Sequence, residues 1–279
     1  MLRAATPLII TAIGGLLSER AGIINIALEG KMLIGAFFAV VVSYYTGNPW
    51  LGILGAAVAG AVLAFVHALV CIEYHANQVV SGIAINMLAT GLTVFLLQVI
   101  FGVAGTSPQV EKLPVWGIFH PLVYFAIILV VIVHLFLFYT PWGLRLRSVG
   151  EHPAAAETAG INVVKTRYIF VTLSGVLAGI SGAALSLGVL NVFVQDMTAG
   201  RGFIALAAMI FGKWTPIGVL LASLLFGFAD ALQMRLQGVG IPSQFIQMLP
   251  YIFTMVALAG FVGKATPPAA LGKTYSNKG

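Results

Sequence analysis

The sequence is dominated by long apolar runs that recur from one end of the chain to the other. An α-helix needs about 20 mostly apolar residues to cross the hydrocarbon core of a bilayer. Seven runs approach or exceed that length, and two shorter apolar segments accompany them: 31–46, 50–72, 79–102, 119–140, 167–190, 215–234 and 244–262, with 2–17 and 199–212. These runs are continuous, whereas the strands of a membrane β-barrel alternate in polarity. The sequence therefore predicts an all-α fold, a polytopic transmembrane helical bundle of about eight or nine hydrophobic segments, some short or re-entrant.

Composition supports a membrane location, because only 8% of the residues are charged and 60% are hydrophobic. Soluble domains carry about 25% charged residues. The 32 glycines suit close helix packing, and Gly175 and Gly179, extended by Ala183, predict a surface on which a neighbouring helix packs closely. We expect 1–262 to form a single transmembrane domain and 263–279 to form a polar, disordered tail.

Basic residues in short loops predict the orientation, since cytoplasmic loops carry an excess of lysine and arginine. The loop 141–166 is bracketed by basic residues, and the tail carries three lysines: Arg145, Arg147, Lys165 and Arg167, then Lys264, Lys273 and Lys278. We expect this loop and the C-terminus to be cytoplasmic in a bacterial plasma membrane. The segment 103–118 has no basic cluster and should lie outside.

Counting crossings backwards from the outside segment 103–118 places 73–78 inside and 46–50 outside. For the chain to end inside, 199–212 must also cross the membrane. The stretch SERAGIINIALEGK (18–31) then lies at the inner side or dips into the bilayer. The first segment, 2–17, is short enough to be a truncated or re-entrant helix.

Motifs for enzymatic chemistry are missing from the sequence. The tail segment AALGKT ends like a phosphate-binding loop, but Pro267 stands where the motif needs its first glycine. The histidines are scattered, and the single Cys71 excludes an internal disulfide. We therefore expect no catalytic site, no metal and no cofactor, and any ATP hydrolysis must come from a partner.

Polar side chains inside the apolar runs are candidates for a translocation path, because each is costly to bury in lipid. Glu29 and Asp230 carry charge, and Asn25 and Asn86 are neutral. Such groups either line a substrate path or tie helices together, and we select Asn25, Glu29 and Asn86 as path candidates. Asn25 and Glu29 are four residues apart and would share a face if that piece is helical. Asp230 is placed to pair with Arg235.

The segment GEHPAAAETAG (150–160) predicts a short capped helix in the cytoplasmic loop. Pro153 suits a first helical turn, and Gly160 can supply a left-handed C-terminal cap. Its mostly alanine faces would let another protein approach the backbone closely. On physical grounds alone, docking to a partner and simple chain reversal are equally good explanations.

Three blocks carry a resemblance to a known family: ATPLIITAIGGLLSERAGIINIALEGKMLIGAF, NQVVSGIAINMLATGLTVFL and SVGEHPAAAETAGINVVKTRYIFVTLSGVLAGISGA. Together they resemble ABC importer permeases of the branched-chain amino acid, ribose and nucleoside group. They are most similar to the nucleoside (guanosine/purine nucleoside) branch. The resemblance runs over about 4–262.

This resemblance implies a transport subunit that works with several partners. It implies a second, different permease, cytoplasmic ABC ATPases that hydrolyse ATP and an extracytoplasmic substrate-binding protein, with membrane lipid around them and no nucleic acid. By position, the coupling helix that contacts the ATPase would comprise Gly150, Glu151, Pro153, Ala156, Glu157 and Gly160. Asn25 and Glu29 fall in the N-terminal block that faces the pathway.

Two alternatives remain open from the sequence. The substrate could be a sugar or a branched-chain amino acid, because affinity in such systems rests largely with the binding protein. A different class, an ion-coupled secondary transporter, would use intramembrane acids such as Glu29 and Asp230 to bind coupling ions.

Overall fold

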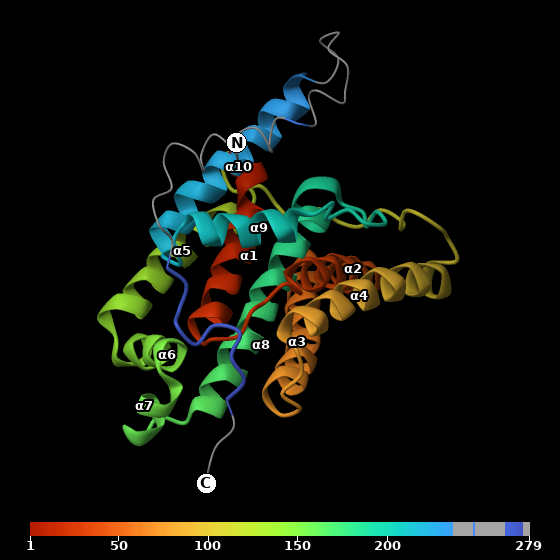
Figure 1. Ribbon diagram of the computed structural model, residues 1–279. Helices are drawn as coiled ribbons and strands as arrows, with labels where there is room; N and C mark the ends of the chain where they lie inside the picture. The colour runs from red at the N-terminus through yellow and green to blue at the C-terminus, as the bar shows by residue number, and fades with distance from the viewer. Residues whose placement is uncertain (237–247, 249–265, 276–279) are drawn as a thin grey trace.

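A computed structural model describes residues 1–236, 248 and 266–275, which form helices joined by short connections (Figure 1). The helices are α1 (Leu2–Arg20), α2 (Leu28–Thr46), α3 (Pro49–Ile72), α4 (Gln78–Phe101), α5 (Pro121–Tyr139), α6 (Pro141–Glu151), α7 (Pro153–Thr158), α8 (Val163–Ala183), the π-helix η1 (Ala184–Leu190), α9 (Arg201–Phe211) and α10 (Pro216–Leu236). The described chain contains isolated β-bridges but no strand. The predicted all-α fold is confirmed.

Six of these helices are long and apolar enough to cross a membrane. They are α2, α3, α4, α5, α8 continued by η1, and α10. They coincide with the first six predicted runs. The seventh run, 244–262, lies outside the described residues. Large apolar side chains such as Leu88, Phe95 and Ile132 remain exposed on α4 and α5, as expected for faces that meet lipid or another membrane subunit.

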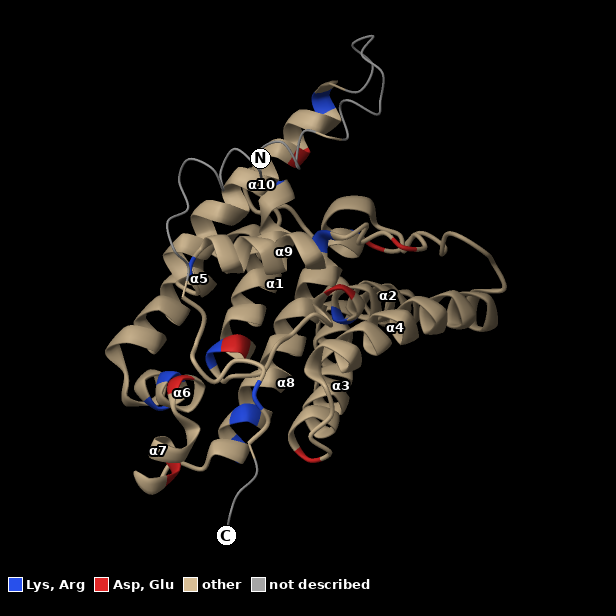
Figure 2. Cartoon of the chain, in the orientation of Figure 1, with Lys and Arg blue, Asp and Glu red and all other residues tan. Residues whose placement is uncertain are grey.

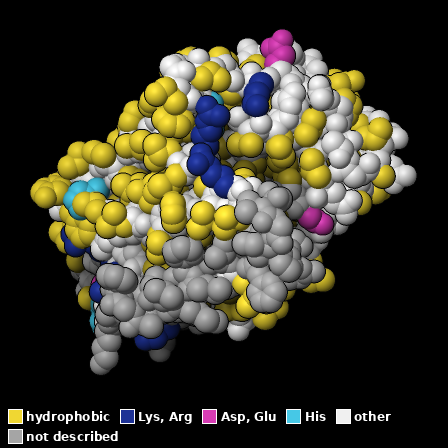
Figure 3. Space-filling model, turned by 90° about the horizontal axis from the view of Figure 1, so that it is seen from above, with side chains coloured by type: hydrophobic (Ala, Val, Ile, Leu, Met, Phe, Trp, Pro, Cys, Tyr) yellow, Lys and Arg dark blue, Asp and Glu magenta, His cyan; other side chains and the backbone are white. Residues whose placement is uncertain are grey.

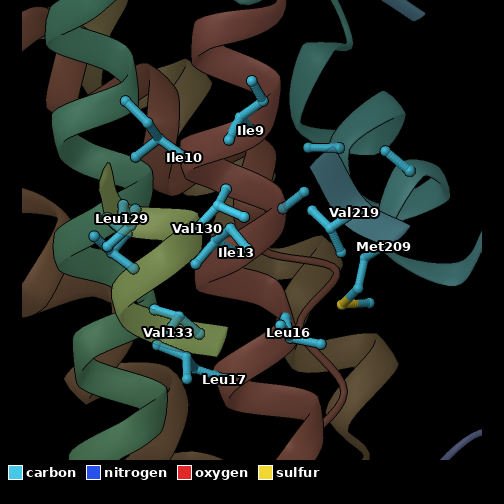
Figure 4. Close-up of a cluster of buried hydrophobic side chains, with 14 of the residues drawn as sticks. Ile9, Ile10, Ile13, Leu16, Leu17, Leu129, Val130, Val133, Met209 and Val219 are labelled. Atoms are coloured by element: carbon cyan, nitrogen blue, oxygen red, sulfur yellow. The ribbon is translucent and has the colours of Figure 1, made fainter. Parts of the chain in front are cut away.

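Helix α1 lies at the centre of the bundle rather than at its margin. Residues 5–19 are buried, and α5, α8, α9 and α10 pack around them. Figure 4 shows the apolar side chains at this junction: Ile9, Ile10, Ile13, Leu16 and Leu17 of α1, Leu129, Val130 and Val133 of α5, Met209 of α9 and Val219 of α10. With 19 residues, α1 is about 28 Å long. Helix α1 is longer than the predicted segment 2–17, but it is not among the six helices long and apolar enough to cross a membrane.

Helix α8 packs against α3 and α2 through small residues. A Cβ atom on Gly60 of α3 would lie 3.0 Å from the Cα atom of Gly179, and Gly35 of α2 also abuts Gly179. Gly175 meets the side chain of Ala64 on α3. The predicted close-packing surface on α8 is confirmed, and it brings three backbones together as small residues do in membranes.

The 199–212 region differs from its prediction. Its helix, α9, has 11 residues and covers only about 16 Å, about half of a bilayer core. The chain does pass between the two ends of the bundle here, because Val110 N donates to Asn191 O at 3.0 Å at one end. At the other end, the Arg20 guanidinium donates to Trp214 O at 2.6 Å. This part of the chain therefore consists of turns and a half-length helix, not a spanning helix.

Two ends of the bundle can be distinguished by the segments that meet there. The α6–α7 end contains Arg20, the α3–α4 turn and residues 266–275. One cavity there is lined by 75–79 and 272–274. At the opposite end, Arg3 donates to Ile118 O at 2.6 Å and the rings of Trp50 and Trp116 lie 5.8 Å apart.

Charged residues concentrate near helix ends and connections (Figure 2). Acidic and basic residues at the start of α2 are an exception inside the bundle. Seen from above, Figure 3 shows a short row of basic side chains on a face that is otherwise largely apolar or neutral.

Residues 266–275, which we call the C-terminal strap, pack across the α6–α7 end. Ala270 N donates to Gly150 O at 2.9 Å, and Gly272 N donates to Gly22 O at 3.1 Å. Ala270 is buried. Where we expected a disordered tail, this stretch is held because the ends of α1 and α6 leave carbonyl groups that need donors.

Candidate functional site

The candidate site is built around a break in the helical structure between α1 and α2. Helix α1 ends at Arg20, and residues 21–27, which we call the unwound segment, run into the bundle before α2 starts at Leu28. Gly22 has a φ of +88°, a left-handed conformation that glycine adopts without strain. Asn25 lies in this segment and Glu29 in α2, so the prediction that they share a helix face is wrong.

Side chains from distant helices satisfy the backbone of the unwound segment. Ile24 N donates to Gln78 Oε1 at 2.7 Å, and Ile24 O lies 3.1 Å from His67 Nε2. Ser18 Oγ donates to Ile23 O at 3.0 Å. Buried non-helical backbone is tolerated at membrane depth only where protein or water replaces its missing hydrogen bonds. These side chains therefore make the break stable.

A buried lysine completes this region. Lys31 Nζ donates to Asn25 Oδ1 at 2.6 Å, and Asn25 Nδ2 donates to Ser174 Oγ of α8 at 2.6 Å. All three side chains are fully buried. Sequence reasoning missed Lys31, although a lysine at the start of the run KMLIGAF was a visible signal. Asn25 thus links the unwound segment to both α2 and α8.

The Glu29 carboxylate caps the N-terminus of α9. Its Oε1 accepts from Gly200 N at 2.8 Å and its Oε2 accepts from Gly202 N at 2.6 Å. A carboxylate is favoured there because the first N–H groups of a helix lack partners and its N-terminus is partly positive. Glu29 therefore joins α2 to α9.

Asn86 of α4 makes a comparable link. Its Oδ1 accepts from Gly30 N at 2.8 Å, and its Nδ2 donates to Ile26 O at 3.0 Å. The structure thus brings Asn25, Glu29 and Asn86 together around one break in the chain. Asn86 and Glu29 keep partial exposure, whereas Asn25 is buried.

Asp230 does not pair as predicted. Its carboxylate lies 3.4 Å from the guanidinium of Arg201, the first residue of α9. The predicted partner, Arg235, lies in the same helix as Asp230, but α10 places Asp230 beside α9 instead. The pair joins α10 to the same helix terminus that Glu29 caps.

The predicted short helix in the 141–166 loop is present as α7, Pro153–Thr158. Pro153 occupies its first turn, and His152 Nδ1 accepts from Ala155 N at 3.1 Å. Gly160, with a φ of +81°, follows it in the left-handed conformation. Pro153 in the first turn and Gly160 after the last turn thus bound the helix that the sequence indicated.

The selected residues of this loop divide into two groups. Gly150, Ala156 and Glu157 pack against the protein, and Glu151 is exposed but bonds to the strap. Gly150 abuts the Arg20 carbonyl, Glu151 accepts from Ala269 N at 3.1 Å, Ala156 packs with Val149 and Val163, and Glu157 accepts the Tyr275 hydroxyl hydrogen. The outward group contains Gly160 and three residues that the sequence did not single out: Ala154, Ala155 and Ala159. Pro153 is partly exposed.

Among the residues that the structure describes, no three histidine, cysteine, aspartate or glutamate side chains gather to hold a metal ion. The polar groups of the site instead bond to backbone and to one another. Their arrangement suits positioning of helices.

Comparison with known proteins identifies the chain. The family described as branched-chain amino acid transport system/permease component matches residues 1–259. The chain belongs to this family. The guanosine ABC transporter permease protein NupQ of Bacillus subtilis is 46% identical, with 97% of this chain and 93% of its own length aligned. The nucleoside ABC transporter permease protein NupC of Lactococcus lactis is 45% identical, with 99% and 95% aligned.

A second Bacillus subtilis relative, the guanosine ABC transporter permease protein NupP, is 26% identical over 93% of this chain and 80% of its own length. No solved structure matches the chain. The predicted resemblance is confirmed, and the chain is a multi-pass permease subunit of an ABC importer.

Proposed function

We propose that this permease imports purine nucleosides as one half of a heterodimer. The observation that carries the substrate is the near full-length similarity to permeases named for guanosine and nucleosides. The heterodimer is supported by the unequal similarity to two Bacillus subtilis permeases, 46% for NupQ and 26% for NupP. The second subunit would then be a NupP-like chain.

In this proposal α7 is the docking element for a cytoplasmic ABC ATPase. Its alanine face is exposed and free of bulky side chains, so a groove on another protein can approach its backbone. The basic residues Arg145, Arg147 and Lys165 bracket it, which favours a cytoplasmic location for the α6–α7 end and the strap. The opposite end would receive the substrate-binding protein.

The proposed mechanism uses ATP binding in the partner to move α7. The ATPase dimer closes, α7 follows, and the packed helices change the side on which the path opens. A ligand or partner can shift such an equilibrium only through contacts that differ between the two states. Asn25, Glu29 and Asn86 lie where α2, α4, α8 and α9 meet, so relative movement of these helices would change the pathway there.

Nucleoside uptake tests the substrate. Cells carrying the intact transport system should accumulate labelled guanosine, and cells lacking only this chain should not. Excess unlabelled adenosine should compete, whereas glucose and leucine should not. If glucose or leucine competes and nucleosides do not, the substrate is a sugar or a branched-chain amino acid.

Co-purification tests the transporter class. A P-loop ATPase should co-purify with the wild-type chain from native membranes in mild detergent. Ala155→Trp should remove the ATPase while the permease stays folded, because Ala155 is exposed. Val115→Trp, at an exposed site on the opposite end, is the matched control. Guanosine uptake driven by an ion gradient, with no associated ATPase, would support the secondary transporter instead.

A further inference from the structure

The C-terminal strap connects α7 to the unwound segment through a continuous series of contacts. At one end, the Tyr275 hydroxyl donates to Glu157 Oε2 of α7. At the other end, Gly272 N donates to Gly22 O in the unwound segment at 3.1 Å. Residues 272–275 of the strap thus connect the proposed ATPase-docking helix to the break beside Lys31 and Asn25.

Arg167 of α8 contacts both the C-terminal strap and the unwound segment. Its Nε donates to Ala21 O at 3.1 Å, and its Nη1 lies 3.4 Å from Lys273 O. Its guanidinium carbon lies 5.9 Å from the centre of the Tyr275 ring, within cation–π range. Arg167 is buried. A single side chain therefore contacts the unwound segment, the backbone of the strap and Tyr275.

The fit between the strap and the unwound segment is close. Gly272 has a φ of +76°, and a Cβ atom there would lie 2.8 Å from Ile24 Cδ1. A Cβ atom on Gly22 would lie 3.0 Å from Arg167 Nη2 and 3.3 Å from Ala270 O. Because closely packed contacts cannot deform continuously, displacement of the strap must displace its neighbours.

By comparison, α7 has few other ties to the bundle. Ala156 is its buried residue, in a small cluster with Val149 and Val163. Non-helical backbone flanks it, at His152 with φ −144° and ψ 84° and at Gly160 with φ +81°. Helix α7 is therefore held to α6 and α8 mainly through this one small cluster.

We propose that Tyr275 and Arg167 are positioning residues that couple the movement of α7 to the unwound segment through the C-terminal strap. When the ATPase displaces α7, the Glu157–Tyr275 contact carries the displacement to residues 270–273 and to the carbonyls of Ala21 and Gly22. The break before α2 then moves with α7. This inference rests on the proposed docking of an ATPase at α7.

The test is the transport stoichiometry of Tyr275→Phe in the full importer reconstituted into liposomes with its ATPase and binding protein. This variant removes the hydroxyl that Glu157 accepts and keeps the ring beside Arg167. We expect the ATPase to co-purify at the wild-type ratio, while the number of guanosine molecules imported per ATP hydrolysed falls several-fold. Thr274→Ala, at an exposed neighbouring position, should keep the wild-type ratio.

Glu157→Gln, alone and combined with Tyr275→Phe, tests whether the two side chains act through the same contact. Because Tyr275 acts through Glu157, Glu157→Gln with Tyr275→Phe should lower the stoichiometry no further than either single change. An unchanged stoichiometry in Tyr275→Phe would overturn the inference. Loss of the ATPase from Tyr275→Phe would also overturn it, since Tyr275 would then belong to the docking surface. Absence of any ATPase from the wild-type preparation would instead refute the proposed function.

Discussion

The unwound segment and α7 are both short interruptions between long apolar helices, yet their polar groups are satisfied in opposite ways. The unwound segment is bonded by side chains of α1, α3, α4 and α8. Helix α7 satisfies its own backbone with a histidine cap and a following glycine, and one face remains exposed. Buried irregular backbone needs partners from the same chain, whereas an exposed helix is free to accept partners from another.

The largest expected effect lies in the unwound segment. Asn25→Ala leaves the Lys31 amine and Ser174 without their partner in a fully buried site. We expect the free energy of unfolding to fall by about 3 kcal/mol, since buried charged donors are costly to leave unpaired. Unfolding of the purified permease in detergent measures this loss.

Two variants control the Asn25 result. Asn48→Ala, which removes an exposed helix cap from α3, should cost only about 1 kcal/mol. Adding Lys31→Met to Asn25→Ala should recover most of the loss, because an apolar side chain needs no partner. If Asn25→Ala lowers the free energy of unfolding no more than Asn48→Ala does, the unwound segment is not held by these bonds.

The second effect concerns the cap on α9. Glu29→Ala removes the acceptor from Gly200 N and Gly202 N, and we expect it to cost about 2 kcal/mol, the scale of hydrogen bonds to a charged group. Glu29→Gln retains one acceptor oxygen and should cost about half of that. Equal losses in the two variants, measured by unfolding in detergent, would show that the carboxylate does not act as a cap.

A smaller effect is expected at α7. Gly160→Val places a branched side chain at a φ of +81°, which costs about 1–2 kcal/mol per residue. Since the bundle does not depend on α7, the strain should loosen only that helix, visible as faster amide hydrogen exchange between 154 and 160. Gly160→Asn should exchange almost like wild type, because asparagine tolerates this conformation. Global unfolding of Gly160→Val would contradict the separation between the two regions.

The smallest effect is a pH dependence of the strap. The hydrogen bond to Glu157 raises the pKa of Tyr275 above the usual tyrosine value of about 10. Because the folded-state pKa of Tyr275 is raised, the stabilisation from its hydrogen bond to Glu157 is fully present below pH ~10. This stabilisation is lost as the pH rises through the raised pKa. Absorbance titration of wild type minus Tyr275→Phe isolates this phenol. In Glu157→Gln, the phenol should titrate at lower pH, and an unchanged titration would contradict the contact.

Sequence reasoning succeeded where a single run of residues contains the whole signal. The six described spans are long and apolar, and α7 is defined by Pro153 and Gly160 within one short segment. The sequence indicated an interruption at 18–31, but not the side chains that hold it, since His67, Gln78 and Asn86 lie 43 to 60 residues away from their partners Ile24 and Ile26.

The strap was missed for a different reason. Its composition of proline, glycine, alanine and lysine is typical of disordered tails. Several of its bonds come from backbone N–H groups, such as those of Ala270 and Gly272, and leave no side-chain pattern. Only Tyr275 offered a signal, as an aromatic residue in an otherwise small and polar tail.

Site-specific crosslinking tests the central claim, that the exposed face of α7 docks on the ATPase. The native Cys71 is buried, so Ala155→Cys adds an accessible thiol at α7 and Val115→Cys adds one at the opposite end. With a thiol-to-amine crosslinker in native membranes, Ala155→Cys should form an adduct with the ATPase and Val115→Cys should not. An adduct from Val115→Cys, with none from a reactive Ala155→Cys, would contradict both the docking surface and the orientation.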